Sequence, residues 1–207
     1  MDRMNGLRAL PGRPSYTALQ QEYAHQLEMA RTSSAGLIEV PPTPGGYALR
    51  QFCPSDEIRY DDLFHLAFED SDRFSEIRER TLEQGFFVVE HLASRDLVAS
   101  CVAMRGSSSP RHPEAGQLGW LVTDPSHVGK GLGSIVAASV TNRLLMEDYA
   151  RPFLGTEDMR TAAISIYLKL GWRPYIYRSE MEARWRSILD RLGRKHERGF
   201  LYSQAPE

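Results

Sequence analysis

One junction constrains the fold of this chain more than any other feature: an apolar segment that leads into alternating glycines. Residues 117–124 have the composition of a β-strand, and Gly129, Gly131 and Gly133 open the segment 131–148, whose apolar residues recur at helical spacing. Alternate glycines let several backbone N–H groups face one point, because no Cβ blocks an approaching anion, and the helix dipole adds to the attraction. The junction therefore predicts a strand, a phosphate-binding loop and a helix, whereas glycines that only turn the chain would account for one or two of the three.

Two nucleotide-binding motifs with a similar layout do not fit this junction. A P-loop needs glycine where Asp124 stands, and it needs serine or threonine after Lys130, where Gly131 stands. A dinucleotide fingerprint that starts at Gly129 needs glycine or alanine where Ser134 stands. A nucleotide-binding protein is therefore the least favoured interpretation.

Apolar patterning predicts that strands and helices alternate along the rest of the chain. We expect strands at 47–52, 85–92, 97–104, 117–124, 152–155 and 173–178. We expect helices at 59–68, 74–84, 131–148, 159–170 and 181–192. This order contains no internal repeat, and it predicts one α/β domain with a central mixed, mostly antiparallel twisted sheet that is flanked by helices.

Amphipathic helices are expected at both ends of the chain. The first carries apolar residues at helical spacing, namely Tyr16, Leu19, Tyr23, Leu27 and Ala30, and a proline-rich linker follows it at 41–46. The last carries Met181, Trp185, Ile188, Leu189 and Leu192 on one face. Each helix either packs on the domain or closes a homodimer. We therefore expect an N-terminal helical extension and linker at 1–46, a domain at 47–178, and a C-terminal amphipathic helix and tail at 179–207.

Composition excludes several classes of function. The chain has 207 residues and a formal net charge of −2, which gives no reason to expect nucleic acid as a partner. The two cysteines, Cys53 and Cys101, do not make a disulfide framework, and six scattered histidines without a Cys-x-x-Cys pair do not indicate a metal site. No apolar run approaches the roughly 20 residues that span a bilayer. We expect a soluble cytoplasmic protein without a metal and without a membrane partner.

Two motifs resemble the GNAT superfamily of acyl-CoA-dependent N-acyltransferases. The glycine junction is similar to the acyl-CoA motif Arg/Gln-x-x-Gly-x-Gly/Ala, and residues 163–172 are similar to Ala-x-x-x-Tyr-x-x-x-Gly followed by an aromatic residue. The resemblance covers residues 47–178, with the motifs in the family's order. Val128 stands where arginine or glutamine is usual, and Arg160 stands where an asparagine often opens the second motif.

The resemblance implies that acetyl-CoA lies between strand 117–124 and the short strand near 153–155. Its pantetheine arm would pair with the backbone of Leu121, Val122 and Thr123, and its pyrophosphate would bind the loop formed by Val128, Gly129, Lys130, Gly131, Leu132 and Gly133. Losing a basic side chain at Val128 removes about 1.5–3 kcal/mol, so we expect weakened rather than abolished binding. Arg160 either contacts a CoA phosphate or an acidic acceptor, or it is a solvated helix residue.

The resemblance also implies direct attack of a primary amine on the thioester, with Tyr167 as the general acid that protonates the departing CoA thiolate. Helical spacing places Tyr167 on the core side of its helix, where a tyrosine that only packs is the alternative. Glu157, Asp158 and Glu90 are the candidate bases, although each is more often a solvated charge.

The sequence thus predicts an N-acetyltransferase that acts on a small-molecule or peptide amine. A non-catalytic acyl-CoA-binding or regulatory domain is the alternative.

Overall fold

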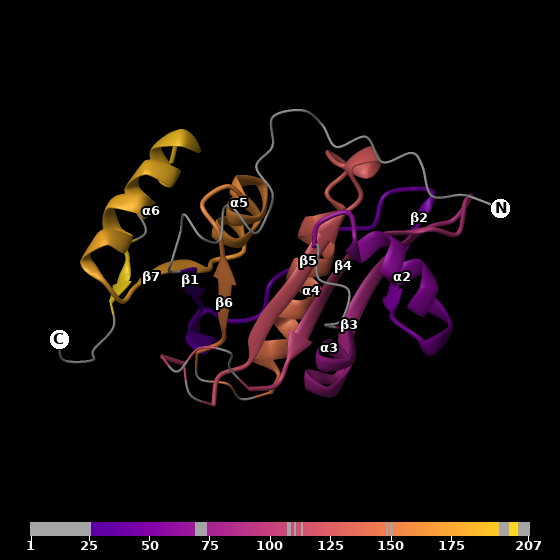
Figure 1. The fold of residues 1–207 in the computed structure, drawn as a ribbon, viewed down its shortest axis with the longest axis horizontal. Helices are drawn as coiled ribbons and strands as arrows, with labels where there is room; N and C mark the ends of the chain where they lie inside the picture. Colours follow the sequence, from indigo (N-terminus) through magenta and orange to yellow (C-terminus); the bar gives the residue numbers. More distant parts are fainter. Residues whose placement is uncertain are drawn as a thin grey trace.

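Eight strands form one mixed sheet (Figure 1), in the order β2-β3-β4-β5-β6-β1-β7-β8. The computed structural model describes residues 26–68, 74–106, 109, 111–112, 114–147, 149, 151–194 and 199–202. The strands are β1 (Leu27–Ala30), β2 (Tyr47–Gln51), β3 (Thr81–His91), β4 (Leu97–Met104), β5 (Gln117–Thr123), β6 (Phe153–Thr156), β7 (Arg173–Ile176) and β8 (Leu201–Tyr202). The described α-helices are α2 (Glu57–Phe64), α3 (Phe74–Arg80), α4 (Leu132–Leu145), α5 (Thr161–Lys169) and α6 (Ser179–Arg191).

Strand direction agrees with the sequence-based expectation of a mostly antiparallel sheet. The neighbours from β2 to β5 are antiparallel, and so are β1 with β6 and β1 with β7. The parallel pairs are β5 with β6 and β7 with β8. The expected α/β fold with helices on both sides of a mixed sheet is confirmed.

Helices cover both faces of the sheet because its central strand is apolar on both sides. All eight residues of β4 are buried. Its Leu97, Val102 and Met104 belong to the cluster formed with α2 and α3. Its Val98, Cys101 and Ala103 belong to the cluster formed with α4, α5 and α6. Figure 1 accordingly shows α2 and α3 on one face of the sheet and α4 on the other.

The N-terminal segment differs from the expected helix. Leu27–Ala30 forms strand β1, which lies between β6 and β7, and all four of its residues are buried. The prediction of a helix at residues 27–30 is therefore wrong. Apolar spacing over so few residues does not show that this segment pairs with strands that lie far along the chain. The expected helical residues 16–25 lie outside the described residues.

Helix α3 is shorter than expected, since it ends at Arg80 and β3 begins at Thr81. The register of β3 against β4 shifts between Thr81 and Phe86, and Gln84 has a φ of 53°. Such a bulge breaks the period-two pattern of a strand. The prediction of helix at 81–84 is therefore wrong, and its cause is this irregular pairing.

The C-terminal helix is confirmed as α6, and its apolar face packs on the core of the same chain. Met181, Trp185 and Ile188 are completely buried. Beyond α6, Leu201–Tyr202 adds the short strand β8 beside β7, which the sequence did not indicate. The end of the chain thus contributes to the sheet as well as covering it.

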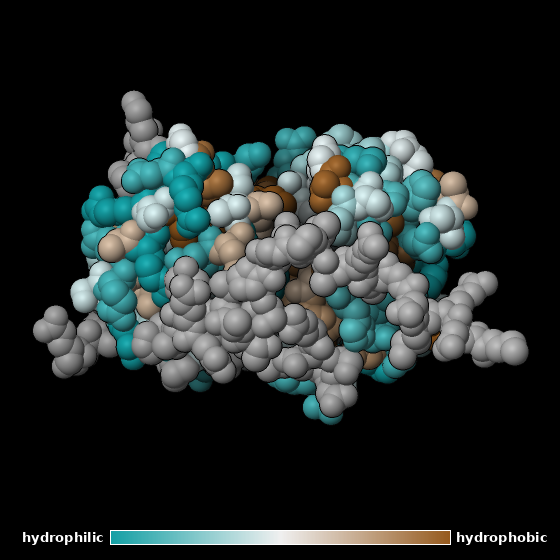
Figure 2. Space-filling model, turned by 45° about the horizontal axis from the view of Figure 1, so that its top comes forward, coloured by the Kyte–Doolittle hydropathy of each residue, from teal (hydrophilic) through white to brown (hydrophobic). Residues whose placement is uncertain are grey.

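Some large apolar side chains of the described residues are exposed. Exposed large apolar residues include Ile58, Leu92, Val128 and Met146. Figure 2 shows a mainly hydrophilic face with apolar colour in small separate areas among the described residues. No helix in the described part of the chain has the length and hydropathy to span a membrane. Cys53 is exposed, Cys101 is buried, and both are free thiols.

Candidate active site

Strands β5 and β6 part after a single residue pair. They run parallel and pair only at Gln117 and Phe153. Beyond that pair, β5 stays bonded to β4 as far as Thr123, and β6 stays bonded to β1 as far as Thr156. The β5 edge that faces β6 therefore has no strand partner among the described residues. Such an edge offers backbone N–H and C=O groups to an extended ligand.

A bulge redirects side chains at this open edge. The register of β5 against β4 shifts between Ser100 and Val102, and Trp120 has a φ of 57°. The Trp120 ring lies 5.4 Å from that of Phe64 and 5.1 Å from that of Phe68, centroid to centroid. Its buried Nε1 atom has no hydrogen-bond partner among the described residues. Sequence reasoning missed Trp120, although Gly119 in the strand interior is a signal of a bulge.

The glycine loop follows β5 at the open end and has the backbone that the sequence predicts for an anion site. Asp124 accepts a hydrogen bond from the Ser126 amide at 2.7 Å and thereby starts the turn. Gly129 and Gly131 have φ values of 82° and 81°, and a Cβ at either would meet nothing within 4 Å. The space in front of both is therefore open. The first turn of α4 also leaves amides without intrahelical acceptors, as in every α-helix.

Gly133 has a different role, because it permits close packing. A Cβ there would lie 3.0 Å from Thr123 Oγ1 and 3.2 Å from Ile166 Cδ1. The first turn of α4 thus touches both the end of β5 and helix α5. This contact brings the glycine loop, the open β5 edge and the helix that carries Tyr167 to one place.

Among the other residues predicted to bind CoA, some side chains are buried and others are exposed. Val122 and Leu132 are buried, so only their backbone is available to a ligand, whereas Leu121 is partly buried against the core cluster. Val128 is 61% exposed. The exposed Lys130 Nζ donates to the Ser126 carbonyl at 3.4 Å, which keeps its charge on the loop.

Tyr167 projects from α5 into the protein and is 5% exposed. Burial raises the pKa of this hydroxyl well above its usual value, the Cys101 thiol acts in the same direction, and Arg160 opposes both. Tyr167 therefore keeps its proton at neutral pH.

The turn between β6 and α5 carries three of the predicted site residues. Glu157 is ion-paired with Arg160 and accepts a hydrogen bond from Gln26 Nε2 at 3.0 Å. The Arg160 guanidinium also lies over the Phe68 ring, 4.9 Å from its centroid. The pair thus faces the end of α2. Asp158 instead turns toward α6, where its carboxylate binds Arg184.

Comparisons with known proteins agree with this geometry. A family model described as FR47-like protein matches residues 108–183, a segment that contains the glycine loop and Tyr167. A GCN5-related N-acetyltransferase from Sphaerobacter thermophilus is similar at a TM-score of 0.57 and 19% identity, over 77% of this chain and 53% of that one. The chain has the GNAT fold. This confirms the resemblance that the two sequence motifs indicated.

Two further solved structures share the GNAT fold. A tandem GNAT protein from the clavulanic acid biosynthesis pathway has a TM-score of 0.55 and 16% identity, over 81% of this chain and 58% of that one. A glucosamine N-acetyltransferase region of a fungal multi-domain GH3 β-N-acetylglucosaminidase has a TM-score of 0.53 and 12% identity, over 82% of this chain and 24% of that one. This chain therefore spans only part of each protein. No curated protein sequence matches it.

Glu90, the third candidate base, lies elsewhere in the GNAT fold, within a network of arginines. It is 2% exposed on β3, with oxygen–nitrogen distances of 2.6 Å to both Arg50 and Arg95 and 3.6 Å to Arg59. Burial alone would raise the pKa of Glu90, but the hydrogen bond from Arg50 and the charges of all three arginines leave the pKa lowered. A carboxylate held in this way is a poor proton acceptor.

Two of these arginines, Arg50 and Arg59, also pair with Asp56, which is completely buried. Burial opposes ionisation of Asp56, yet hydrogen bonds from Arg50 and Cys53 outweigh it and lower the pKa. In the unfolded chain both carboxyls have pKa values of about 4. Their contribution to stability is therefore complete above pH 4, and it is lost as the pH falls through the lower folded-state values.

We expect Arg50→Met to reduce the free energy of unfolding by about 2 kcal/mol at pH 7, because it leaves Asp56 and Glu90 with fewer partners. We also expect a smaller difference between wild type and variant at pH 3, where the unfolded carboxyls are protonated. Urea unfolding followed by tryptophan fluorescence at both pH values measures this. Arg186→Met is the control, since Arg186 pairs with Glu182 at the surface. An equal loss at both pH values would contradict this account of the network.

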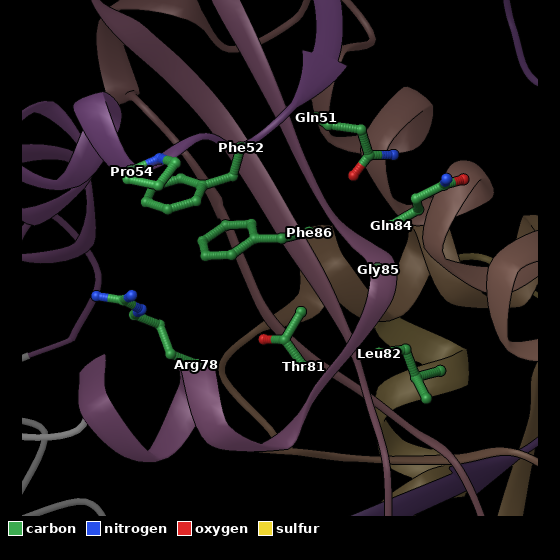
Figure 3. Close-up of a pocket in the computed structure, with 9 residues that line it drawn as sticks. All are labelled: Gln51, Phe52, Pro54, Arg78, Thr81, Leu82, Gln84, Gly85 and Phe86. Carbon is green, nitrogen blue, oxygen red and sulfur yellow. The ribbon is translucent and has the colours of Figure 1, made fainter.

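A separate hollow of about 330 Å³ lies at the edge of the sheet, away from the predicted site (Figure 3). The Phe52 and Phe86 rings stack 4.4 Å apart and form part of its wall, and Gln51, Arg78 and Gln84 add polar groups. None of its lining residues belongs to the glycine loop, the open β5 edge or the turn before α5. In the described part of the chain, no group of three His, Cys, Asp or Glu residues is arranged to hold a metal ion.

Proposed function

We propose that this protein is an N-acetyltransferase that transfers an acetyl group from acetyl-CoA to a primary amine of a small molecule or peptide. The observation that carries this proposal is the open edge of β5, which leads directly into the glycine loop at the start of α4. An extended thiol carrier with a pyrophosphate matches both features at once. The GNAT fold of the chain supports the same donor.

The donor would lie along β5. Its pantetheine arm pairs with the backbone of Leu121–Thr123 as an added strand would. Its pyrophosphate accepts hydrogen bonds from the amides of Gly129–Gly133, with Lys130 adding a positive charge. A backbone N–H of β5 polarises the thioester carbonyl and stabilises the oxyanion that forms during attack.

Tyr167 is placed in the last step of the proposed reaction, the protonation of the departing CoA thiolate. The amine nitrogen attacks the carbonyl carbon and a carbon–nitrogen bond forms. The carbon–sulfur bond then breaks and the CoA thiolate takes the Tyr167 proton. The raised pKa of Tyr167 keeps that proton available at neutral pH. The neutral amine becomes a cationic nitrogen when the carbon–nitrogen bond forms, and the proton that this nitrogen then loses converts the tyrosinate back to tyrosine.

Of the three candidate carboxylates, Glu157 is the best placed to act as the base. An alkylammonium with a pKa of about 10.4 must lose a proton, at a cost of about 4–5 kcal/mol at pH 7. Asp158 is bound by Arg184 and Glu90 by three arginines, whereas Glu157 stands in the turn that follows β6, beside the open edge. Its Arg160 partner also comes from that turn.

We expect Glu157→Gln to lower kcat by about tenfold to a hundredfold at pH 7 and by much less at pH 10, where the amine is already neutral. Profiles of kcat/KM against pH for wild type and variant measure this. Glu147→Gln is a matched control, because Glu147 pairs with Arg143 at the far end of α4. A pH profile that the Glu157 change leaves untouched would remove Glu157 from proton transfer.

A non-catalytic acyl-CoA-binding domain is the second candidate, and the exposed Val128 in place of a basic residue is the observation that favours it. Release of CoA thiol from acetyl-CoA distinguishes the two. The panel of amines should include polyamines, amino acids, aminoglycosides, peptides and glucosamine, the last because a similar fungal region is a glucosamine N-acetyltransferase. Thiol release with any of them supports transfer. A thermal shift with acetyl-CoA but no release would favour the binding domain.

A further inference from the structure

Two arginines of helix α6 bind the turn that contains Glu157. Arg184 donates to the Asp158 carboxylate from Nε at 3.2 Å and from Nη2 at 2.5 Å, one bond to each oxygen. Arg191, two turns further along the same helix, donates to the Asp158 carbonyl at 3.5 Å. Asp158 is only 9% exposed. A bidentate contact of this kind fixes orientation as well as distance.

The helix itself is a rigid support. Met181, Trp185 and Ile188 are completely buried, and Trp185 belongs to the main core cluster. Arg184 lies beside Trp185 in the sequence, so its stem starts from an anchored part of α6. A side chain that projects from a packed helix holds its partner more precisely than one on a loop does.

The other two charged residues of the turn, Glu157 and Arg160, are held by neighbours from other parts of the chain. Glu157 is held by Arg160 and by Gln26, whose carbonyl accepts a hydrogen bond from the Tyr177 hydroxyl at 2.6 Å. Arg160 in turn lies over Phe68 at the end of α2. The turn is thus bound to α6 through Asp158, while Glu157 and Arg160 contact Gln26 and Phe68.

The two arginines that bind the turn lie outside the segment that the family model matches. The FR47-like match ends at residue 183, so Arg184 and Arg191 both follow it. Asp158 lies inside the match, but its partners do not. The ion pair therefore joins a residue inside the matched segment to a residue outside it.

We propose that Asp158 is a positioning residue, whose ion pair with Arg184 fixes the turn 157–160 so that Glu157 and Arg160 meet the amine acceptor. This inference rests on the proposed acetyl transfer and assigns α6 a part in it. Asp158 itself transfers no proton, which differs from the sequence-based expectation that it is a candidate base. Because the turn follows β6 and not β5, loosening it disturbs the acceptor side and leaves the glycine loop in place.

Steady-state kinetics of Asp158→Asn and Arg184→Gln test this inference. We expect each change to lower kcat/KM for the amine about tenfold and to leave the Kd of acetyl-CoA within about twofold. In the double variant, kcat/KM for the amine should fall no further than in either single variant, because each single change already removes the same contact. Arg184→Lys keeps the charge but loses the bidentate geometry, so its kcat/KM for the amine should lie between the values for wild type and Arg184→Gln. Arg186→Gln, on the same helix, should behave as wild type.

Hydrogen exchange gives a readout that does not depend on activity. The Arg160 amide donates to the Glu157 carbonyl at 3.0 Å, so its exchange rate reports the integrity of the turn. We expect Asp158→Asn to speed this exchange about tenfold, with α4 unchanged. If wild type releases no thiol with any amine, the proposed function fails while the exchange result stands. Unaltered exchange, or lower thermal stability with unaltered amine kinetics, would overturn the positioning role.

Discussion

Replacing Tyr167 by phenylalanine should lower kcat at least about tenfold and leave the Kd of acetyl-CoA within about twofold. The substitution removes one oxygen and keeps the buried ring, so packing on α5 is preserved. Without the hydroxyl, the CoA thiolate must take its proton from water. Turnover measured by thiol release, together with calorimetric binding of acetyl-CoA, separates the chemical step from binding.

The chain offers a matched control for this substitution. Tyr60 is also buried, and burial also raises its hydroxyl pKa, but it lies in the cluster with α2 and α3 on the other face of the sheet. Tyr60→Phe should therefore keep wild-type turnover. Equal turnover in Tyr167→Phe and wild type would leave Tyr167 as a packing residue only.

A large loss of affinity for acetyl-CoA is expected when Gly131 is replaced by alanine. With a φ of 81°, this position costs an alanine about 1–2 kcal/mol of backbone strain. Relief of that strain turns the neighbouring amides away from a common point, and the new Cβ enters the open space in front of the loop. We expect Gly131→Ala to raise the Kd of acetyl-CoA about tenfold or more, measured by isothermal titration calorimetry.

Gly46→Ala controls for strain alone. Gly46 has a φ of 83° and also has nothing within 4 Å of an added Cβ, but it stands before β2 and outside the loop. Both variants should therefore lose similar stability in urea unfolding, while only Gly131→Ala loses affinity. Equal affinity for acetyl-CoA in the two variants would show that the loop does not bind it.

The parts of the candidate site that the sequence indicated most directly are contiguous in the chain. The glycine loop and Tyr167 each belong to a motif whose spacing reflects local backbone geometry, and the structure places both on elements that meet at Gly133. Most strand positions in the first half of the sheet also follow from local apolar patterning. These features require no knowledge of distant contacts.

Distant contacts account for what the sequence did not predict. Strand β1 is defined by pairing with β6 and β7, which lie far along the chain, and its four residues show no pattern that excludes a helix. Asp158 and Glu90 were both expected as candidate bases, but their arginine partners come from other elements. The Trp120 bulge likewise depends on its register against β4. Charge and spacing alone do not show which carboxylates are already paired.

Everything proposed for this protein requires that the loop at Gly129–Gly133 binds the diphosphate of coenzyme A. Isothermal titration calorimetry of the wild-type protein with CoA, and separately with pantetheine, which carries the same arm without the diphosphate, tests it most directly. We expect saturable one-to-one binding of CoA and binding of pantetheine at least about a hundredfold weaker, because pantetheine lacks the charged hydrogen bonds of the diphosphate. Absence of heat with millimolar CoA, or equal affinity for the two compounds, would contradict it.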